Sequence, residues 1–153
     1  MDKVWQIIRR KPPFFLIISL AYLAAVVFLK WRLGLTFPVL LFVSGGVAGI
    51  YFLDIAEVVF AISPSPFRSI VFAVLFALVS FFVVTSSGSF LGSGLVLTLY
   101  LTLVLWQLGE WKIRGNLTSW YQMVSGPVTV KVQRWLLLLF IAIFMIETYL
   151  FVR

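Results

Sequence analysis

The chain has 153 residues, of which 63% are hydrophobic and only 11% are charged, and its mean hydropathy is +1.14. Soluble domains carry about 25% charged residues, so this composition excludes an ordinary soluble domain and favours an integral membrane protein. The net charge is +7, but the 12 Lys and Arg residues lie in small groups between apolar runs and form no dense basic face. We therefore expect no nucleic-acid binding.

Cysteine and histidine are both absent from the sequence. The chain therefore has no disulfide and no imidazole for a catalytic dyad or triad, and it lacks the commonest metal ligands, so we expect no metal and no cofactor. The stretch SSGSFLGSG, residues 86–94, has no following lysine to make a phosphate-binding loop and no histidine to activate Ser93. We interpret it as a turn and a helix start, and we expect no enzymatic activity.

Five apolar segments are long enough to cross a bilayer, which requires about 20 mainly apolar residues per helix. The first follows a basic stretch, as a signal peptide does, but it is followed by Lys30, Trp31 and Arg32 without a small-residue cleavage site, so we interpret it as a retained span. The sequence predicts an all-α, polytopic transmembrane helix bundle in one domain, with spans at about 13–29, 37–62, 66–84, 90–108 and 135–152.

Helix-capping residues support these boundaries, because Ser and Thr bind the free amides of a first turn and proline is tolerated there. Thr36, Ser65 and Ser125 each come just before a segment that begins with proline within two residues. Between the third and fourth spans lies only the short stretch 85–89, TSSGS, which predicts a tight antiparallel hairpin.

The basic residues predict how the chain is oriented, because cytoplasmic loops carry the excess of Lys and Arg. If the five spans alternate in direction, nine basic residues fall on one side and three on the other: Lys3, Arg9, Arg10, Lys11, Arg68, Lys112, Arg114, Lys131 and Arg134 against Lys30, Arg32 and Arg153. We expect a multi-pass protein of the cell membrane, plasma or inner, with a cytoplasmic N-terminus and an external C-terminus.

The second span carries two acidic residues, Asp54 and Glu57, in an otherwise uncharged segment. At 100° per residue they lie about 60° apart, on one face of the helix. Gly45, Gly49 and Ala56 lie on the opposite side and form a small-residue stripe of the GxxxG kind, at which another helix can approach closely. The sequence thus predicts one side for close helix packing and one acidic side.

Two interpretations of the acid pair are open. Asp54 and Glu57 can lie at the inner end of the bundle and form ion pairs, with Arg68 across the SPSP turn or with Lys112, Arg114 or Lys131 from the later connector. Alternatively, they line a polar cavity and bind a cation or a proton, since acidic groups within a membrane span often mark an ion pathway.

Glu147 lies in the fifth span, close to its outer end. Because that end is near, the ordinary expectation is that the carboxylate reaches outward to water. The alternative makes Glu147 an outer polar station that is linked to the acid pair through Ser80, Thr98, Thr102 and Gln107. For the hydroxyl groups, the ordinary expectation is a hydrogen bond to a carbonyl in the preceding turn of the same helix.

Residues 110–134 form the one sizeable connector that does not span the membrane. Its stretch WKIRGNLTSWYQMV mixes aromatic, basic and small polar residues and is typical of a short interfacial helix. We expect an anchor at the membrane surface, with binding of anionic lipid headgroups or of a partner protein as the alternative. Pro127 is expected to start a helix that continues into the fifth span.

A small bundle of this kind rarely encloses a substrate cavity alone. The main hypothesis is therefore a non-enzymatic subunit or scaffold of a membrane complex, in contact with the bilayer and with further copies of itself or other membrane subunits. The alternative is a small oligomeric transporter or channel for a cation, a proton or a small solute, with Asp54 and Glu57 as its site.

Overall fold

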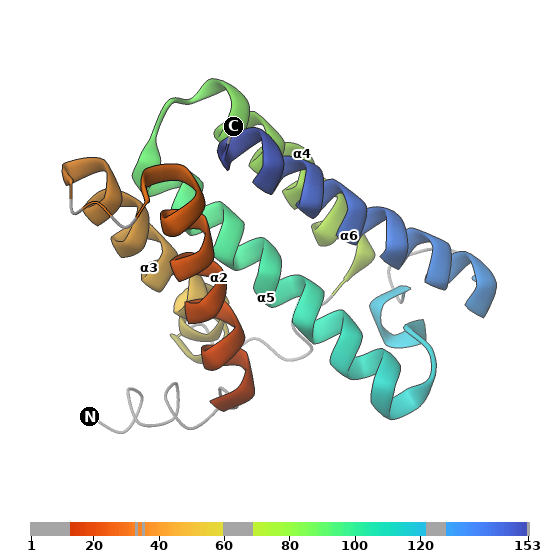
Figure 1. Ribbon diagram of the computed structural model, residues 1–153. Coiled ribbons are helices and arrows are strands. Elements are labelled where there is room, and N and C mark those ends of the chain that lie inside the picture. The colour runs from red at the N-terminus through yellow and green to blue at the C-terminus, as the bar shows by residue number, and fades with distance from the viewer. Residues whose placement is uncertain (1–12, 33, 35, 60–68, 122–127, 153) are drawn as a thin grey trace.

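A computed structural model of the chain describes residues 13–32, 34, 36–59, 69–121 and 128–152. These residues form five α-helices and one short 3-10 helix, and they contain no strand. The α-helices are α2 (Pro13–Trp31), α3 (Phe37–Val59), α4 (Ile70–Ser86), α5 (Phe90–Arg114) and α6 (Val130–Val152), and the 3-10 helix η1 (Thr118–Tyr121) lies between the last two (Figure 1). The predicted all-α helix bundle is confirmed.

Four of the helices, α2, α3, α5 and α6, are long and apolar enough to cross a membrane, with 19, 23, 25 and 23 residues. Helix α4 is equally apolar but has 17 residues, which is the lower limit for a span. It begins after Ser69, whose side chain accepts a hydrogen bond from the amide of Phe72. The predicted start of this span at Ser65 and Pro66 lies outside the described residues.

The five helices alternate in direction along the bundle (Figure 1). The C-terminal ends of α2 and α6 meet, since Lys30 Nζ donates a hydrogen bond of 2.7 Å to the carbonyl of Phe151. The Trp31 ring also contacts Phe90, at the start of α5, with 5.7 Å between the ring centroids. The start of α2 and the end of α6 therefore lie at opposite ends of the bundle.

Helices α3 and α5 are in close contact because glycines face the partner backbone. A Cβ atom on Gly45 or Gly49 would lie less than 3.0 Å from the carbonyl oxygens of Leu91 and Leu95, and one on Gly94 would meet the carbonyl of Phe42 equally closely. The small-residue stripe on α3 thus packs within the bundle, against α5. Ala56, further along α3, is half-buried.

Helix α5 is the central helix of the bundle (Figure 1). Every residue from Val96 to Gln107 is buried, so this stretch is covered on all sides by its neighbours. The outer helices instead expose large apolar side chains, such as Ile17 on α2, Leu78 on α4 and Met145 on α6. Exposed apolar faces on helices of this length fit a lipid environment.

The helices on either side of the connector extend beyond the predicted spans. The fourth span was expected to end at Leu108, but α5 continues to Arg114 and ends at Gly115, which has a left-handed φ of 72°. The extra turns are stabilised by the ion pair between Glu110 and Arg114, at 3.0 Å, and by the basic residues at the helix C-terminus.

The fifth span was predicted at about 135–152, within a helix that was expected to start before it, and α6 begins at Val130. Thr129 Oγ1 accepts a hydrogen bond from the amide of Val132, which is the pattern of an N-terminal cap. The predicted continuation of a helix through residues 130–134 into the span is confirmed, while its proposed start at Pro127 lies outside the described residues. The connector is therefore shorter than the sequence predicts, and η1 forms part of it.

Candidate functional site: the buried polar residues

Asp54 and Glu57 are both buried in the bundle, each with 3% of its surface exposed. Glu57 lies on the side of α3 that faces α2, because it is about 20° around the helix from Gly46, and a Cβ on Gly46 would meet the side chain of Leu23 on α2. Asp54 lies about 60° further around the helix. Glu57 is about 16 Å further along the helix axis than Gly46. The acid pair therefore lies toward the end of the bundle at which α2 begins.

The predicted ionic partners of this pair are only partly described. Arg68 lies outside the described residues. Arg114 forms its ion pair with Glu110 in the same helix, and its side chain is 62% exposed, so the predicted pairing of Arg114 with the acid pair is wrong. Lys112 and Lys131 are exposed.

Glu147 is fully buried, with 0% of its surface exposed, so the expectation that it reaches outward to water is wrong. Its two carboxylate oxygens lie 2.9 and 3.1 Å from Ser80 Oγ on α4. Among the described residues, it forms no ion pair. The physical reason is the packing of α6 against α4, which places this face of α6 inside the bundle.

The Ser80 hydroxyl also lies 3.0 Å from the carbonyl oxygen of Ala77. A hydroxyl has one hydrogen, so Ser80 can donate to the Ala77 carbonyl or to the Glu147 carboxylate, but not fully to both. If Glu147 carries a proton, its carboxyl group donates to Ser80 and Ser80 donates to Ala77. The geometry thus accommodates a protonated carboxyl in which both hydroxyl hydrogens, that of Glu147 and that of Ser80, have an acceptor.

Two threonines on α5 make the hydrogen bonds that were expected for hydroxyl groups in apolar helices. Thr98 Oγ1 lies 2.9 Å from the carbonyl of Gly94, and Thr102 Oγ1 lies 3.0 Å from that of Thr98. Thr98 additionally lies 2.8 Å from the carbonyl of Gly46 on α3. Its one hydrogen is therefore shared between a carbonyl of its own helix and one of α3, in the stretch where the glycines face the partner backbone.

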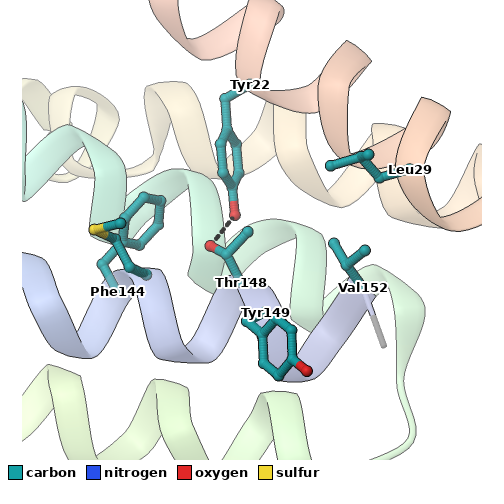
Figure 2. Close-up of a pocket in the computed structure, with 7 residues that line it drawn as sticks. Tyr22, Leu29, Phe144, Thr148, Tyr149 and Val152 are labelled. Atoms are coloured by element: carbon teal, nitrogen blue, oxygen red, sulfur yellow. Dashed lines mark hydrogen bonds between the residues drawn. The ribbon is translucent and has the colours of Figure 1, made fainter.

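Two tyrosines bind α6 to its neighbours. Tyr22 on α2 and Thr148 on α6 form a hydrogen bond of 2.8 Å between their hydroxyl groups, which Figure 2 shows between the two helices. Tyr100 on α5 donates a 2.6 Å bond to the carbonyl of Phe140, and its ring stacks on that of Phe140 with 4.2 Å between the centroids. Neither tyrosine was predicted as a helix contact, because the sequence of an apolar segment does not indicate which residue an aromatic side chain will bond to.

Two buried glutamines differ in their hydrogen bonding. Gln133 on α6 accepts a hydrogen bond from the amide of Leu117 and donates one to the carbonyl of Val128, so it fixes the connector against α6. Gln107 on α5 is 1% exposed, and neither atom of its amide group has a partner within the described ranges. The buried hydroxyl of Tyr121 in η1 also lacks a partner there, and burial raises the pKa of this phenol.

A cavity of about 360 Å³ lies between α2 and α6. Figure 2 shows Leu29, Phe144, Val152 and the Tyr22–Thr148 hydrogen bond around it. Two more cavities, between α4 and α6, have only apolar lining residues. One smaller cavity has polar lining residues, at the end of the bundle where α2 and α6 meet.

Within the described ranges, no group of three or more acidic side chains could hold a metal ion. Asp54 and Glu57 lie on α3 and Glu147 bonds to α4, so the described contacts do not join these carboxylates into one site. No protein family, curated protein or solved structure matches this chain. The candidate site is therefore a set of separate buried polar contacts between helices.

Proposed function

We propose that this protein is a non-enzymatic subunit or scaffold of a membrane complex. The observation that carries this proposal is the way in which interior polar groups are used. Thr98, Tyr22 and Tyr100 each bond one helix to another, and Gln133 bonds the connector to α6. Hydrogen bonds of this kind specify how helices pack in a membrane.

The position of the cavities supports the same proposal. The cavities between α4 and α6, and the large one beside Tyr22, are lined mainly by apolar residues of the outer helices. Carriers and channels instead line their pathways with polar or ionisable side chains. None of the four cavities described above is lined by Asp54, Glu57 or Glu147.

A partner subunit has to bind at the outer helices. The glycines of α3 are already in contact with α5, so they are not available to a second chain. The exposed apolar faces of α2, α4 and α6 remain, and they are covered by lipid or by other subunits. We expect the protein to lie in the cell membrane, with the start of α2 on the cytoplasmic side and the end of α6 outside, as the distribution of basic residues favours.

Native mass spectrometry of the protein purified in a mild detergent tests this proposal. We expect a homo-oligomer, or a complex with other membrane proteins of the source cell. A monodisperse monomer that brings down no partner would overturn the subunit proposal. The same preparation, solubilised again in a harsh detergent, is the control. It identifies complexes that are observed only because two proteins share one detergent micelle.

A second function, proton transport, is favoured by Glu147. This carboxyl is fully buried, it bonds to a serine on another helix, and its surroundings accommodate the protonated form. Buried carboxyls with these properties carry protons in many membrane pumps and transporters. Proton flux into liposomes that depends on Glu147 would support this second function over the first.

A further inference from the structure

A small polar cavity lies at the end of the bundle where α2 and α6 finish and α5 begins. Its volume is about 190 Å³, which is room for about six water molecules at roughly 30 Å³ each. Lys30, Ser89 and Ser93 provide the polar side chains of its wall, with Phe90 and Phe151 among the apolar ones. None of these polar residues takes part in the helix contacts between α3 and α5.

Ser93 has a hydrogen-bonding group that the described residues leave unused. The residue is 3% exposed and lines the cavity, yet its hydroxyl has no hydrogen-bond partner in the described ranges. Hydroxyls buried in apolar helices normally bond to a carbonyl of the preceding turn, as Ser80 and Thr102 do here. The Ser93 hydroxyl is therefore a donor in the cavity wall that a bound molecule can satisfy.

The start of α5 adds a positive electrostatic field to the same cavity. Ser89 caps the helix by accepting a hydrogen bond from the amide of Gly92, and Ser89 and Phe90 are both in the cavity wall. The first amides of a helix lack intrahelical acceptors, and the aligned peptide dipoles place partial positive charge there. Such a terminus favours an anion.

Lys30 supplies a full positive charge. Its ammonium group donates one hydrogen bond, to the Phe151 carbonyl, and lies 4.8 Å from the centroid of the Phe151 ring. An ammonium has three donors, so it can donate to a further acceptor. No carboxylate lines the cavity within the described ranges, and the nearest acidic residue along α6, Glu147, bonds to Ser80.

The level of the cavity in the molecule indicates the source of the anion. Trp31 lies beside Lys30, and its ring contacts Phe90 and Phe151, which both line the cavity. Tryptophan and lysine at the end of a membrane span are typical of the headgroup level. We propose that this cavity binds the phosphate group of a phospholipid, through Lys30, the Ser93 hydroxyl and the N-terminus of α5.

Native mass spectrometry of the full chain in mild detergent tests the site with added phosphatidylglycerol. We expect Lys30→Gln to weaken lipid binding about fivefold, since one basic residue near a membrane surface contributes about that factor. Ser93→Ala should weaken binding less, without altering packing, and so it serves if Lys30→Gln fails to fold. Thr102→Ala, which removes a buried hydroxyl from α5 away from the cavity, is the matched control for Ser93→Ala and should bind as the unsubstituted chain does.

Two further ligands identify the group that is bound. Diacylglycerol has the same acyl chains without the phosphate, so it should bind far more weakly than phosphatidylglycerol. The proposal is overturned if diacylglycerol binds as well as phosphatidylglycerol, or if both Lys30→Gln and Ser93→Ala bind the phospholipid as Thr102→Ala does. Displacement of the phospholipid by millimolar inorganic phosphate would overturn the lipid assignment and identify a soluble phosphate as the ligand.

Discussion

Glycine residues determine how closely α3 and α5 approach. A Cβ added at Gly94 would meet the backbone carbonyl of Phe42, which cannot move without moving the helix. We expect Gly94→Ala to lower the free energy of unfolding by about 1–3 kcal/mol, the usual cost of overpacking. Gly109→Ala, in the same helix but with open space around it, is the matched control.

Unfolding in mixed micelles, followed by circular dichroism, measures this difference. The control should be neutral or up to about 1 kcal/mol more stable, because alanine is the better helix former. Equal stability of the two variants would show that the close approach of α3 to α5 is wrong.

The bond between Ser80 and Glu147 is the main polar contact between α4 and α6. Ser80→Ala removes the one described hydrogen-bond partner of a fully buried carboxyl group. We expect it to lower the free energy of unfolding by about 0.6–1.7 kcal/mol, from the average to the largest value found for such bonds in a membrane protein. Thr85→Ala, which removes an exposed hydroxyl from the same helix, should change stability little. A larger loss of stability in Thr85→Ala than in Ser80→Ala would contradict the contact between Ser80 and Glu147.

The sequence predicted which polar residues share a helix face better than it predicted which residues surround them. Spacing alone predicted that Asp54 and Glu57 share a face, because helical periodicity is a local property. It could not predict that Glu147 is buried, because this depends on how α6 packs against Ser80 of α4, 67 residues away. Tyr22 and Thr148, 126 residues apart, were missed for the same reason.

At the scale of helices, the connector depends on Gln133. Its side chain satisfies the amide of the buried Leu117 and the carbonyl of Val128. Gln133→Leu leaves both groups without a partner and should lower the free energy of unfolding by about 1–3 kcal/mol.

The same substitution at Gln107 is expected to have the opposite sign. Both atoms of this buried amide group lack a partner in the described ranges, so an apolar side chain of similar size removes an unsatisfied group. Gln107→Leu should be neutral or stabilising by up to about 1 kcal/mol. Thermal unfolding of the two variants, measured side by side, tests both predictions. If Gln107→Leu loses as much stability as Gln133→Leu, the amide group of Gln107 has hydrogen-bond partners in the membrane.

The ends of the helices were the least predictable part of the fold. Apolar runs gave the five helices, because bilayer thickness determines the length of a span. They did not give the end of α5, since the polar turns up to Arg114 are held by the Glu110–Arg114 pair and end at the left-handed Gly115. Local capping and pairing determine such an end, and hydropathy does not report either.

At the scale of the whole molecule, the alternating helices predict which residues face which compartment. The absence of cysteine allows single cysteines to be introduced and labelled. Ser87→Cys, in the hairpin between α4 and α5, should react with an impermeant maleimide added outside intact cells. Lys112→Cys, near the other end of α5, should react only after the cells are opened. Labelling of both from one side would contradict an α5 that crosses the membrane.

On the proposed function, the buried polar residues of this bundle stabilise helix packing and do not carry ions. Proton flux into liposomes that contain the purified protein distinguishes the two roles, measured with the unsubstituted chain, Glu147→Gln and the Asp54→Asn/Glu57→Gln double variant. We expect no flux above that of empty liposomes for any of the three. Flux through the unsubstituted chain that either variant abolishes, and that Thr85→Ala leaves intact, would contradict it.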